Sequence, residues 1–216
     1  FLDDNAANPA RKIQKFPEQK RDRWVTPEEL PKLAKAIEQE KNPYIRAALW
    51  LYLLTGLRRG ELLEATWDNV DLERRELRIP DTKNGSTHYI PLAAPAVEIL
   101  RSLLRLDGNP HILPGRCVGD HLGELSGAWE RVRTAAKIKD VRLHDLRRTV
   151  GSWLAQAGNS LHLIGRVLNH KNTTTTAIYA RFGQDAVRQA IEEHGEKIMR
   201  VAKGEKAAVV EIRGAA

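Results

Sequence analysis

Residues 143–149 read Leu-His-Asp-Leu-Arg-Arg-Thr and lie at the start of a helix that the sequence pattern predicts over 145–157. His144 and Arg147 are three positions apart, so their side chains share a face on a helix. A histidine can move a proton near neutral pH, and an arginine fork can hold two phosphate oxygens. The pair suits phosphate chemistry, although a surface helix start with mixed charges would look the same.

A second charged segment, Thr-Gly-Leu-Arg-Arg-Gly-Glu at 55–61, follows a run predicted to form a helix over 43–55. This helix is apolar nearly all round, which is typical of a buried core helix, and Gly56 ends it. A rigid core helix is a good platform for holding Arg58 still. Taken alone, the segment also fits a helix cap followed by a solvated turn.

Two further segments carry a lysine, a histidine and a tyrosine. Thr-Lys-Asn-Gly at 82–85 places Lys83 in a hairpin turn, where lysine is usually only a soluble turn residue. After His170, a threonine run at 173–176 can cap a helix that carries Tyr179. Alone, this tyrosine would more often be a packing residue than a nucleophile, and this histidine could be a core histidine.

The order of the segments decides between these readings. The segments are TGLRRGEL (55–62), TKNGSTHYIPL (82–92), LHDLRRT (143–149) and LNHKNTTTTAIYAR (168–181). Together they resemble the tyrosine recombinase or phage integrase family, over about residues 26–181. The resemblance implies a catalytic domain that cuts and rejoins DNA through a 3′-phosphotyrosine.

The resemblance also implies a role for each matching residue. Two arginines grip the scissile phosphate, a hairpin lysine reaches toward the cleavage site, and a tyrosine is the nucleophile. The implied catalytic residues are Arg58, Lys83, His144, Arg147, His170 and Tyr179, with Glu61 in support. The basic neighbours expected to contact DNA are Arg59, Arg142, Arg148 and Lys171. Asn169 replaces the usual glycine before the second histidine, and asparagine is the next best residue for a left-handed cap.

The expected chemistry needs general acid–base catalysis and no cofactor. A phenol has a pKa of about 10, so Tyr179 needs a base, for which His144 is the choice by family analogy, with Lys83 or His170 assisting. Lys83 is the expected general acid for the leaving 5′-oxygen. The sequence has no carboxylate cluster for a two-metal site, no Walker-type loop and no common zinc-ligand spacing. We therefore expect neither a metal ion nor ATP.

The amino-acid composition limits the classes of protein to which the chain can belong. The 216 residues include 35 Lys and Arg against 28 Asp and Glu, which gives a formal charge of +7. A basic balance favours nucleic acid as a partner, although many soluble proteins are mildly basic. The single cysteine, Cys117, excludes an intrachain disulfide and fits a reducing cytosol. No apolar run is long enough to span a bilayer, so no membrane partner is expected.

The predicted fold is mainly α with a small antiparallel β-sheet (α+β). A helix is expected to begin at Thr26-Pro27, with a short helix at 59–65 and three strands between 66 and 92. The other predicted helices span 95–106, 120–137, 145–157, 160–168, 173–181 and 184–202, with Gly158 and Gly183 at helix ends, and residues 207–213 could add a late strand.

The chain begins with Phe1 and is interpreted as a fragment. Residues 1–24 are predicted to be a linker from a missing N-terminal DNA-binding domain, and 25–183 the catalytic domain. Residues 184–216 are predicted to be a C-terminal helix and tail, exchanged between protomers. By family analogy we expect a homotetramer on synapsed DNA at a specific recombination site, a monomer for the isolated fragment, and a place in the cytoplasm with the prokaryotic nucleoid.

Two rival functions remain at this point. A type IB topoisomerase would use the same chemistry without exchanging partners, but the compact spacing and the LNHK…Y segment favour the recombinase. A DNA-binding relative that has lost catalysis is the second rival, and it is disfavoured because every expected catalytic position is filled.

Overall fold

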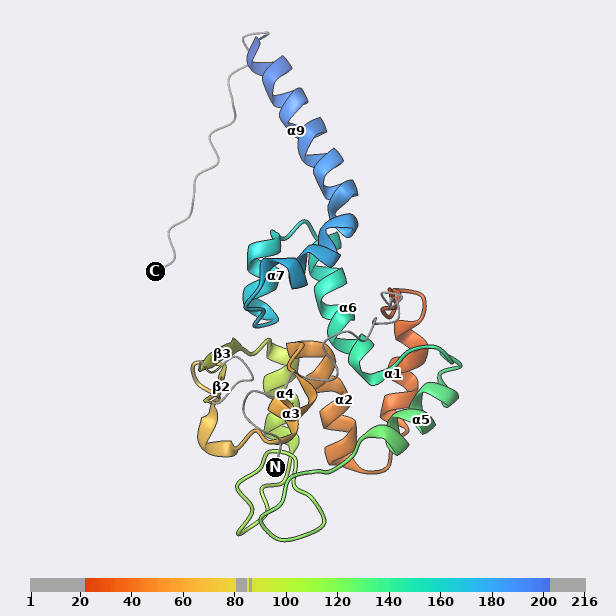
Figure 1. Ribbon diagram of the computed structural model, residues 1–216, viewed down its shortest axis with the longest axis vertical. Coiled ribbons are helices and arrows are strands. Elements are labelled where there is room, and N and C mark those ends of the chain that lie inside the picture. Colours follow the sequence, from red (N-terminus) through yellow and green to blue (C-terminus); the bar gives the residue numbers. More distant parts are fainter. Residues whose placement is uncertain (1–21, 81–84, 86, 203–216) are drawn as a thin grey trace, which may run out of the picture.

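The computed structural model describes residues 22–80, 85 and 87–202 (Figure 1). Within this part of the chain, helices pack around one small antiparallel sheet, which confirms the predicted fold class. The first elements are α1 (Leu30–Glu38), α2 (Pro43–Thr55), α3 (Arg59–Leu63), the 3₁₀ helix η2 (Trp67–Asn69), β1 (Val70–Asp71), β2 (Glu76–Ile79) and β3 (His88–Pro91). They are followed by α4 (Ala94–Ser102), α5 (Ser126–Ala135), α6 (Leu143–Gln156), α7 (Leu161–Val167), α8 (Thr173–Thr176), the 3₁₀ helix η3 (Ala177–Gly183) and α9 (Gln184–Ala202).

Helix α2 has the bounds predicted from its sequence, because local signals mark both ends. The Asn42 side chain accepts hydrogen bonds from the amides of Tyr44 and Ile45, and Pro43 occupies the first turn. Gly56 closes the helix in the left-handed conformation, with φ of 63°. The helix is therefore fixed in length, and the chain leaves it at a defined angle toward Arg58.

The sheet has the order β1-β2-β3 and is antiparallel throughout. Leu77 pairs with Ile90 and Ile79 with His88. The first predicted strand is wrong over most of its length, because residues 67–69 form the 3₁₀ helix η2. The amide of Trp67 bonds to the carbonyl of Pro110, 2.9 Å away, and not to a sheet partner.

Other differences from the predicted elements lie at their ends. Helix α1 is bounded at Leu30 and not at Pro27, because residues 27–29 form turns before it, in which the amide of Glu29 bonds to the Thr26 carbonyl at 3.1 Å. The helix predicted over 95–106 stops at Ser102, and that over 120–137 starts at Ser126. The helix predicted over 173–181 divides into α8 and η3, Gly158 ends α6 as predicted with φ of 79°, and Gly183 lies where η3 meets α9. The strand predicted at 207–213 lies outside the described residues.

Two hydrophobic clusters share helix α6. The larger one joins α1–α5, the sheet and the first half of α6, and the smaller one consists of Ala155, Ile164, Leu168 and Tyr179. In Figure 1, α6 runs from the larger body up to α7, and α9 projects beyond both. Exposed apolar side chains on α9 are Val187, Ile191, Ile198 and Met199. Within the described part of the chain, no helix has the length and apolar character to cross a bilayer.

The end of α2 is packed tightly against α6 and α7. A Cβ atom added at Gly56 would lie 2.8 Å from Leu168 Cδ2 and 3.2 Å from Val150 Cγ1. We predict that Gly56→Ala lowers the free energy of unfolding by about 2–5 kcal/mol, since left-handed strain costs roughly 1–2 kcal/mol and overpacking roughly 1–3 kcal/mol. Denaturant titration followed by circular dichroism measures the loss.

Gly119→Ala is the matched control. Gly119 also has a positive φ, of 81°, but a Cβ atom there would meet nothing within 4 Å. It should therefore lose only the roughly 1–2 kcal/mol that backbone strain costs. Equal losses in the two variants would show that the packing of Gly56 against Leu168 contributes nothing.

Candidate functional site

Arg58 is held by an acidic residue one turn further along the chain. It is the N-cap of α3, and its amide donates to Glu61 Oε2 at 3.0 Å. Its guanidinium Nη1 donates to Glu61 Oε1 at 2.7 Å, and Nη2 donates to the carbonyl of Asn169 at 2.9 Å. The Glu61 side chain is only 7% exposed, so Arg58 has a fixed, partly desolvated partner. The side chain thus joins the start of α3 to the loop after α7.

Arg147 is buried between the ends of two helices, with 4% of its surface exposed. Its Nη1 donates to the carbonyl of Gly56, at the end of α2, and its Nη2 donates to the carbonyl of Leu168, at the end of α7. Burial first, and then the nearby charge of Arg58, lower the pKa of Arg147 to about 10. The guanidinium therefore still carries its charge at neutral pH.

His144 lies in the first turn of α6, on the same helix as Arg147. The turn is closed by Asp145, whose Oδ2 accepts from the Arg142 amide at 2.8 Å. The His144 side chain is partly accessible to solvent. Partial desolvation lowers its pKa below the usual 6.5, and the charges of Arg147 and Arg148 lower this pKa further. His144 is therefore mostly neutral at pH 7 and able to accept a proton.

His170 lies beside the same two arginines, in the loop after α7. Its Nδ1 is 3.0 Å from Thr176 Oγ1, which fixes the ring against α8. Burial, followed by the charges of Arg147 and Arg58, lowers the pKa of His170 to about 4. Asn169, just before it, has a φ of 46°, which confirms the prediction that asparagine supports a left-handed backbone here.

Tyr179 lies on η3 and packs face-on against α6. It is 3% exposed, and a Cβ atom added at Gly151 would lie 2.4 Å from its Cζ. Burial raises the pKa of the phenol, while the charges of Arg147 and Arg148 oppose that rise. The hydroxyl therefore stays protonated at neutral pH and lies within electrostatic reach of Arg147.

The other residues expected in the site are Lys83 and four basic residues assigned to DNA contact. Lys83 lies outside the described residues. Arg59 forms an exposed ion pair with Glu124 at 2.8 Å, and Arg142 and Lys171 are exposed. Arg148 is partly buried and lies 3.9 Å from Asp145, on the side of α6 that faces Tyr179.

Two site residues were not singled out from the sequence. The ring of His88, on β3, hydrogen-bonds to the Val167 carbonyl, and burial is the main cause of its lowered pKa, with Arg147 and Arg58 contributing. Tyr52, on α2, is 1% exposed, and its hydroxyl accepts from the Arg59 amide. Neither residue belongs to a recognisable spacing, since both reach the site only through the packing of distant segments.

A cleft of about 1210 Å³ is lined in part by His170 and by Asn169, whose carbonyl accepts a hydrogen bond from Arg58. One wall is β3, and the other is α7 with the loop that leads into α8 (Figure 1). The imidazole, amide and cationic side chains in its lining are His88, His162, Arg166, Asn169, His170 and Lys171. Cationic and neutral imidazole groups at the mouth of a cleft suit a phosphate-bearing polymer. Among the described residues, no three His, Cys, Asp or Glu side chains cluster as a metal site would require.

Comparison with known proteins matches this arrangement to one family. The model of the phage integrase family matches residues 23–184. The shufflon-specific DNA recombinase of Escherichia coli is 30% identical over 141 residues, which cover 64% of this chain and 34% of that protein. The integrase of Salmonella phage P22 is 26% identical over 198 residues, covering 84% of this chain and 48% of the relative. The chain thus spans about a third to a half of the length of these two curated relatives.

Solved structures share the fold. The crystal structure of XerA recombinase superposes with a TM-score of 0.67 at 20% identity, covering 82% of this chain and 66% of that one. The catalytic domain of bacteriophage HP1 integrase gives a TM-score of 0.61 at 19% identity, covering 78% of this chain and 93% of that one. Because the family model spans most of the folded region and both arginine-bearing segments, this chain belongs to the phage integrase family.

Proposed function

We propose that this chain is the catalytic domain of a site-specific DNA recombinase or integrase that cuts and rejoins duplex DNA through a covalent bond to Tyr179. The observation that carries the proposal is the fixed pair of guanidinium groups, Arg58 and Arg147, with His144 and His170 beside them. Relatives named as recombinases and integrases support it, as does the likeness of fold to XerH recombinase bound to its difH substrate.

In this proposal the two arginines bind the non-bridging oxygens of the scissile phosphate. Negative charge builds on these oxygens in the transition state, and fixed cationic donors stabilise it without having to reorganise. The guanidinium of Arg147 is preorganised by two backbone carbonyls, and that of Arg58 by Glu61 and the Asn169 carbonyl. Loss of one such donor typically slows a reaction about 10²–10³-fold.

Proton transfer completes the step. The phenol oxygen of Tyr179 attacks phosphorus and gives its proton to His144, and the 5′-oxygen leaves with a proton from Lys83. The raised pKa of Tyr179 makes the base necessary, and the lowered pKa of His144 keeps that base unprotonated at neutral pH. The phosphotyrosine conserves the bond energy, so a 5′-hydroxyl reseals the strand by the reverse reaction without cofactor or ATP.

The partners and the remaining segments follow from the same proposal. The DNA is a duplex carrying a specific recombination site, and the working assembly is a homotetramer on synapsed DNA, in the cytoplasm with the nucleoid. Residues 1–24 link to an N-terminal DNA-binding domain. From residue 184 onward the chain docks on a neighbouring protomer, and the exposed apolar side chains Val187, Ile191 and Ile198 on α9 give it a face to bury.

The first prediction tests the nucleophile. A nicked suicide substrate that carries the recombination site, incubated with the full-length protein in EDTA, should give a covalent protein–DNA band on a denaturing gel. Tyr179→Phe should lose this band and keep DNA binding, because only the attacking oxygen is removed.

Tyr44→Phe is the control for this experiment and should leave the band intact, because Tyr44 does not line the cleft and its hydroxyl donates to the Leu104 carbonyl at 3.0 Å. If DNA is bound and no band forms with the wild-type chain, the protein is a DNA-binding relative without catalysis. A band that persists in Tyr179→Phe would assign the nucleophile to another residue.

The second prediction concerns His144 and His170, whose pKa values are lowered in the folded chain. In the folded chain His170 should titrate near pH 4 in an NMR titration, and His144 below 6.5. The unfolded chain takes up these protons from pH 6.5 downward, so stability should fall as pH falls from 6.5 to 4. His170→Gln should lose less stability over that window than the wild type, measured by urea titration at each pH.

His162→Gln serves as the comparison, because His162 is exposed at the start of α7. Its pH dependence should match that of the wild type. A His170 midpoint near 6.5 would mean that neither burial nor the charges of Arg147 and Arg58 lower its pKa.

The third prediction concerns DNA binding by the 216-residue chain. Binding to random duplex DNA should be weak, on the order of micromolar or weaker at physiological salt, and strongly dependent on salt. Lys171→Ala should reduce the slope of log K against log salt by about 1, because this exposed lysine lines the cleft.

Lys41→Ala removes a similarly exposed charge just before α2 and should leave the slope unchanged. Fluorescence anisotropy between 50 and 300 mM salt measures both variants. Nanomolar binding to random DNA at physiological salt would contradict the expectation.

A further inference from the structure

The segment before α1 lies across the helix that carries Tyr179. Residues 22–25, which we term the strap, contact η3 through their side chains: Asp22 pairs with Arg181, and Trp24 meets Phe182 edge to face at 5.6 Å. The guanidinium of Arg181 also lies 4.5 Å from the centre of the Phe182 ring. The strap therefore touches the two residues that lie one turn beyond the tyrosine.

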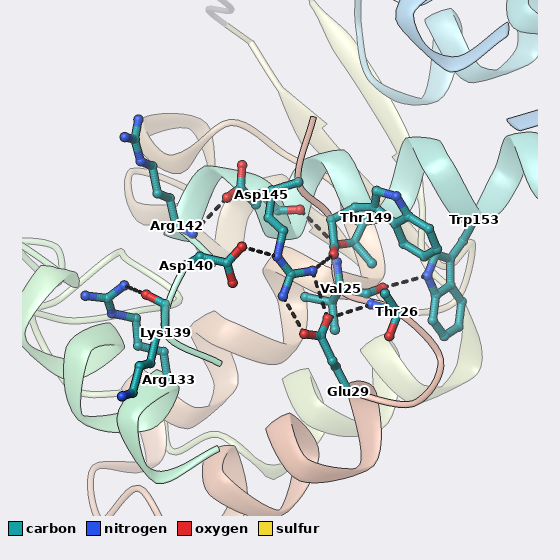
Figure 2. Close-up of polar contacts among 12 residues, drawn as sticks. Val25, Thr26, Glu29, Arg133, Lys139, Asp140, Arg142, Asp145, Thr149 and Trp153 are labelled. Atoms are coloured by element: carbon teal, nitrogen blue, oxygen red, sulfur yellow. Dashed lines mark hydrogen bonds and ion pairs between the residues drawn. The ribbon is translucent and has the colours of Figure 1, made fainter. Parts of the chain in front are cut away.

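The strap is anchored on α6 by its backbone. Val25 donates its amide to Thr149 Oγ1 at 2.9 Å and accepts from Trp153 Nε1 at 3.0 Å, as Figure 2 shows. Arg23 adds an ion pair to Asp140 at 2.8 Å and a hydrogen bond to Glu29. With Val25 fully buried, these contacts fix the strap to the core.

The strap is anchored on the same stretch of α6 that carries Gly151. The Tyr179 ring packs on Gly151, and we term this position its seat. Thr149 and Trp153 are one helical turn apart, and Gly151, against which the Tyr179 ring packs, lies between them. Between strap and η3 only a crevice of about 10 Å³ remains, lined in part by Tyr179, Ser152 and Trp24. That is room for about one water molecule, so the tyrosine is enclosed between helix and strap.

The tyrosine segment is the part of this contact best able to move. η3 is a 3₁₀ helix of seven residues, whereas 3₁₀ runs longer than three or four residues are uncommon because their hydrogen bonds are poorly aligned. Tyr179 is only 3% exposed where its ring packs on Gly151, so its hydroxyl is covered as long as the ring stays there. To reach a phosphate of bound DNA, the hydroxyl must leave its seat on Gly151, and the strap lies over η3.

We propose that the strap is a positioning element that retains Tyr179 on Gly151, so that Asp22 and Trp24 control how often the tyrosine leaves its seat. The proposal rests on the proposed role of Tyr179 as nucleophile. Loss of the Trp24 ring removes a packed aromatic contact from η3 and shifts the balance toward the unseated tyrosine. A shift of roughly 3- to 10-fold is expected, since a single aromatic contact is lost.

The first readout needs no DNA. The chain is treated with tetranitromethane, and nitration at Tyr179 is quantified by peptide mass spectrometry, with exposed Tyr89 as internal standard. Trp24→Ala should raise Tyr179 nitration roughly 3- to 10-fold, and Trp24→Phe should restore the wild-type level because a ring remains against Phe182.

Trp50→Ala is the matched control. Trp50 is a partly buried tryptophan of α2 that bonds to Glu38 at 2.7 Å, away from the strap, so its truncation should leave Tyr179 nitration unchanged. Equal nitration in Trp24→Ala and the wild type, with circular dichroism unchanged, would overturn the proposal. So would an equal rise in the Trp50→Ala control.

The second readout is the rate of covalent adduct formation in a single turnover on the suicide substrate. Trp24→Ala should raise this rate roughly 3- to 10-fold with DNA affinity unchanged, and an unchanged or lower rate would overturn the restraining role. If no variant forms an adduct, the proposed function fails, and the nitration result still decides whether the strap holds Tyr179.

Discussion

The buried guanidinium of Arg147 ties together the ends of two helices. It donates to the Gly56 carbonyl that closes α2 and to the Leu168 carbonyl that closes α7. Carbonyls at helix C-termini carry partial negative charge and have no partner within their own helix, so they offset the cost of burying a cation. The same contact sets the distance between the two helices. It also holds the positive charge at the start of the loop that contributes Asn169 and His170 to the lining of the cleft.

That charge also contributes to the lowered pKa values of its histidine neighbours. His88, His144 and His170 come from three separate elements, and in each case burial is the main cause of a lowered pKa, with Arg147 contributing. A group of three protonated imidazoles beside two guanidinium ions would repel itself, so the packed site favours neutral rings. Neutral imidazoles can accept protons. The negative charge of a bound phosphodiester would raise the pKa values of these histidines again in part.

The sequence determined the parts of the structure that local interactions control. Helix α2 could be bounded because Asn42 and Gly56 act within one turn of its ends, and Asn169 could be assigned a left-handed backbone because its side chain tolerates it. Trp67 was assigned to a strand wrongly, because its amide partner, Pro110, is distant in the chain. His88 and the strap were missed for the same reason: the contacts of His88 with Val167, and of Val25 with Thr149, exist only after folding.

Helix α6 combines these features because it is rigid and long enough to serve two purposes. Its first two turns hold His144 and Arg147, and the next turn carries the Gly151 seat between Thr149 and Trp153, the anchors of the strap. A displacement of the strap therefore cannot readily alter the arginine without breaking α6, whereas it can release η3, whose 3₁₀ hydrogen bonds are weaker. In the proposed function, phosphate binding and presentation of the tyrosine are thus separable, because the arginine pair can stay preorganised while Tyr179 moves.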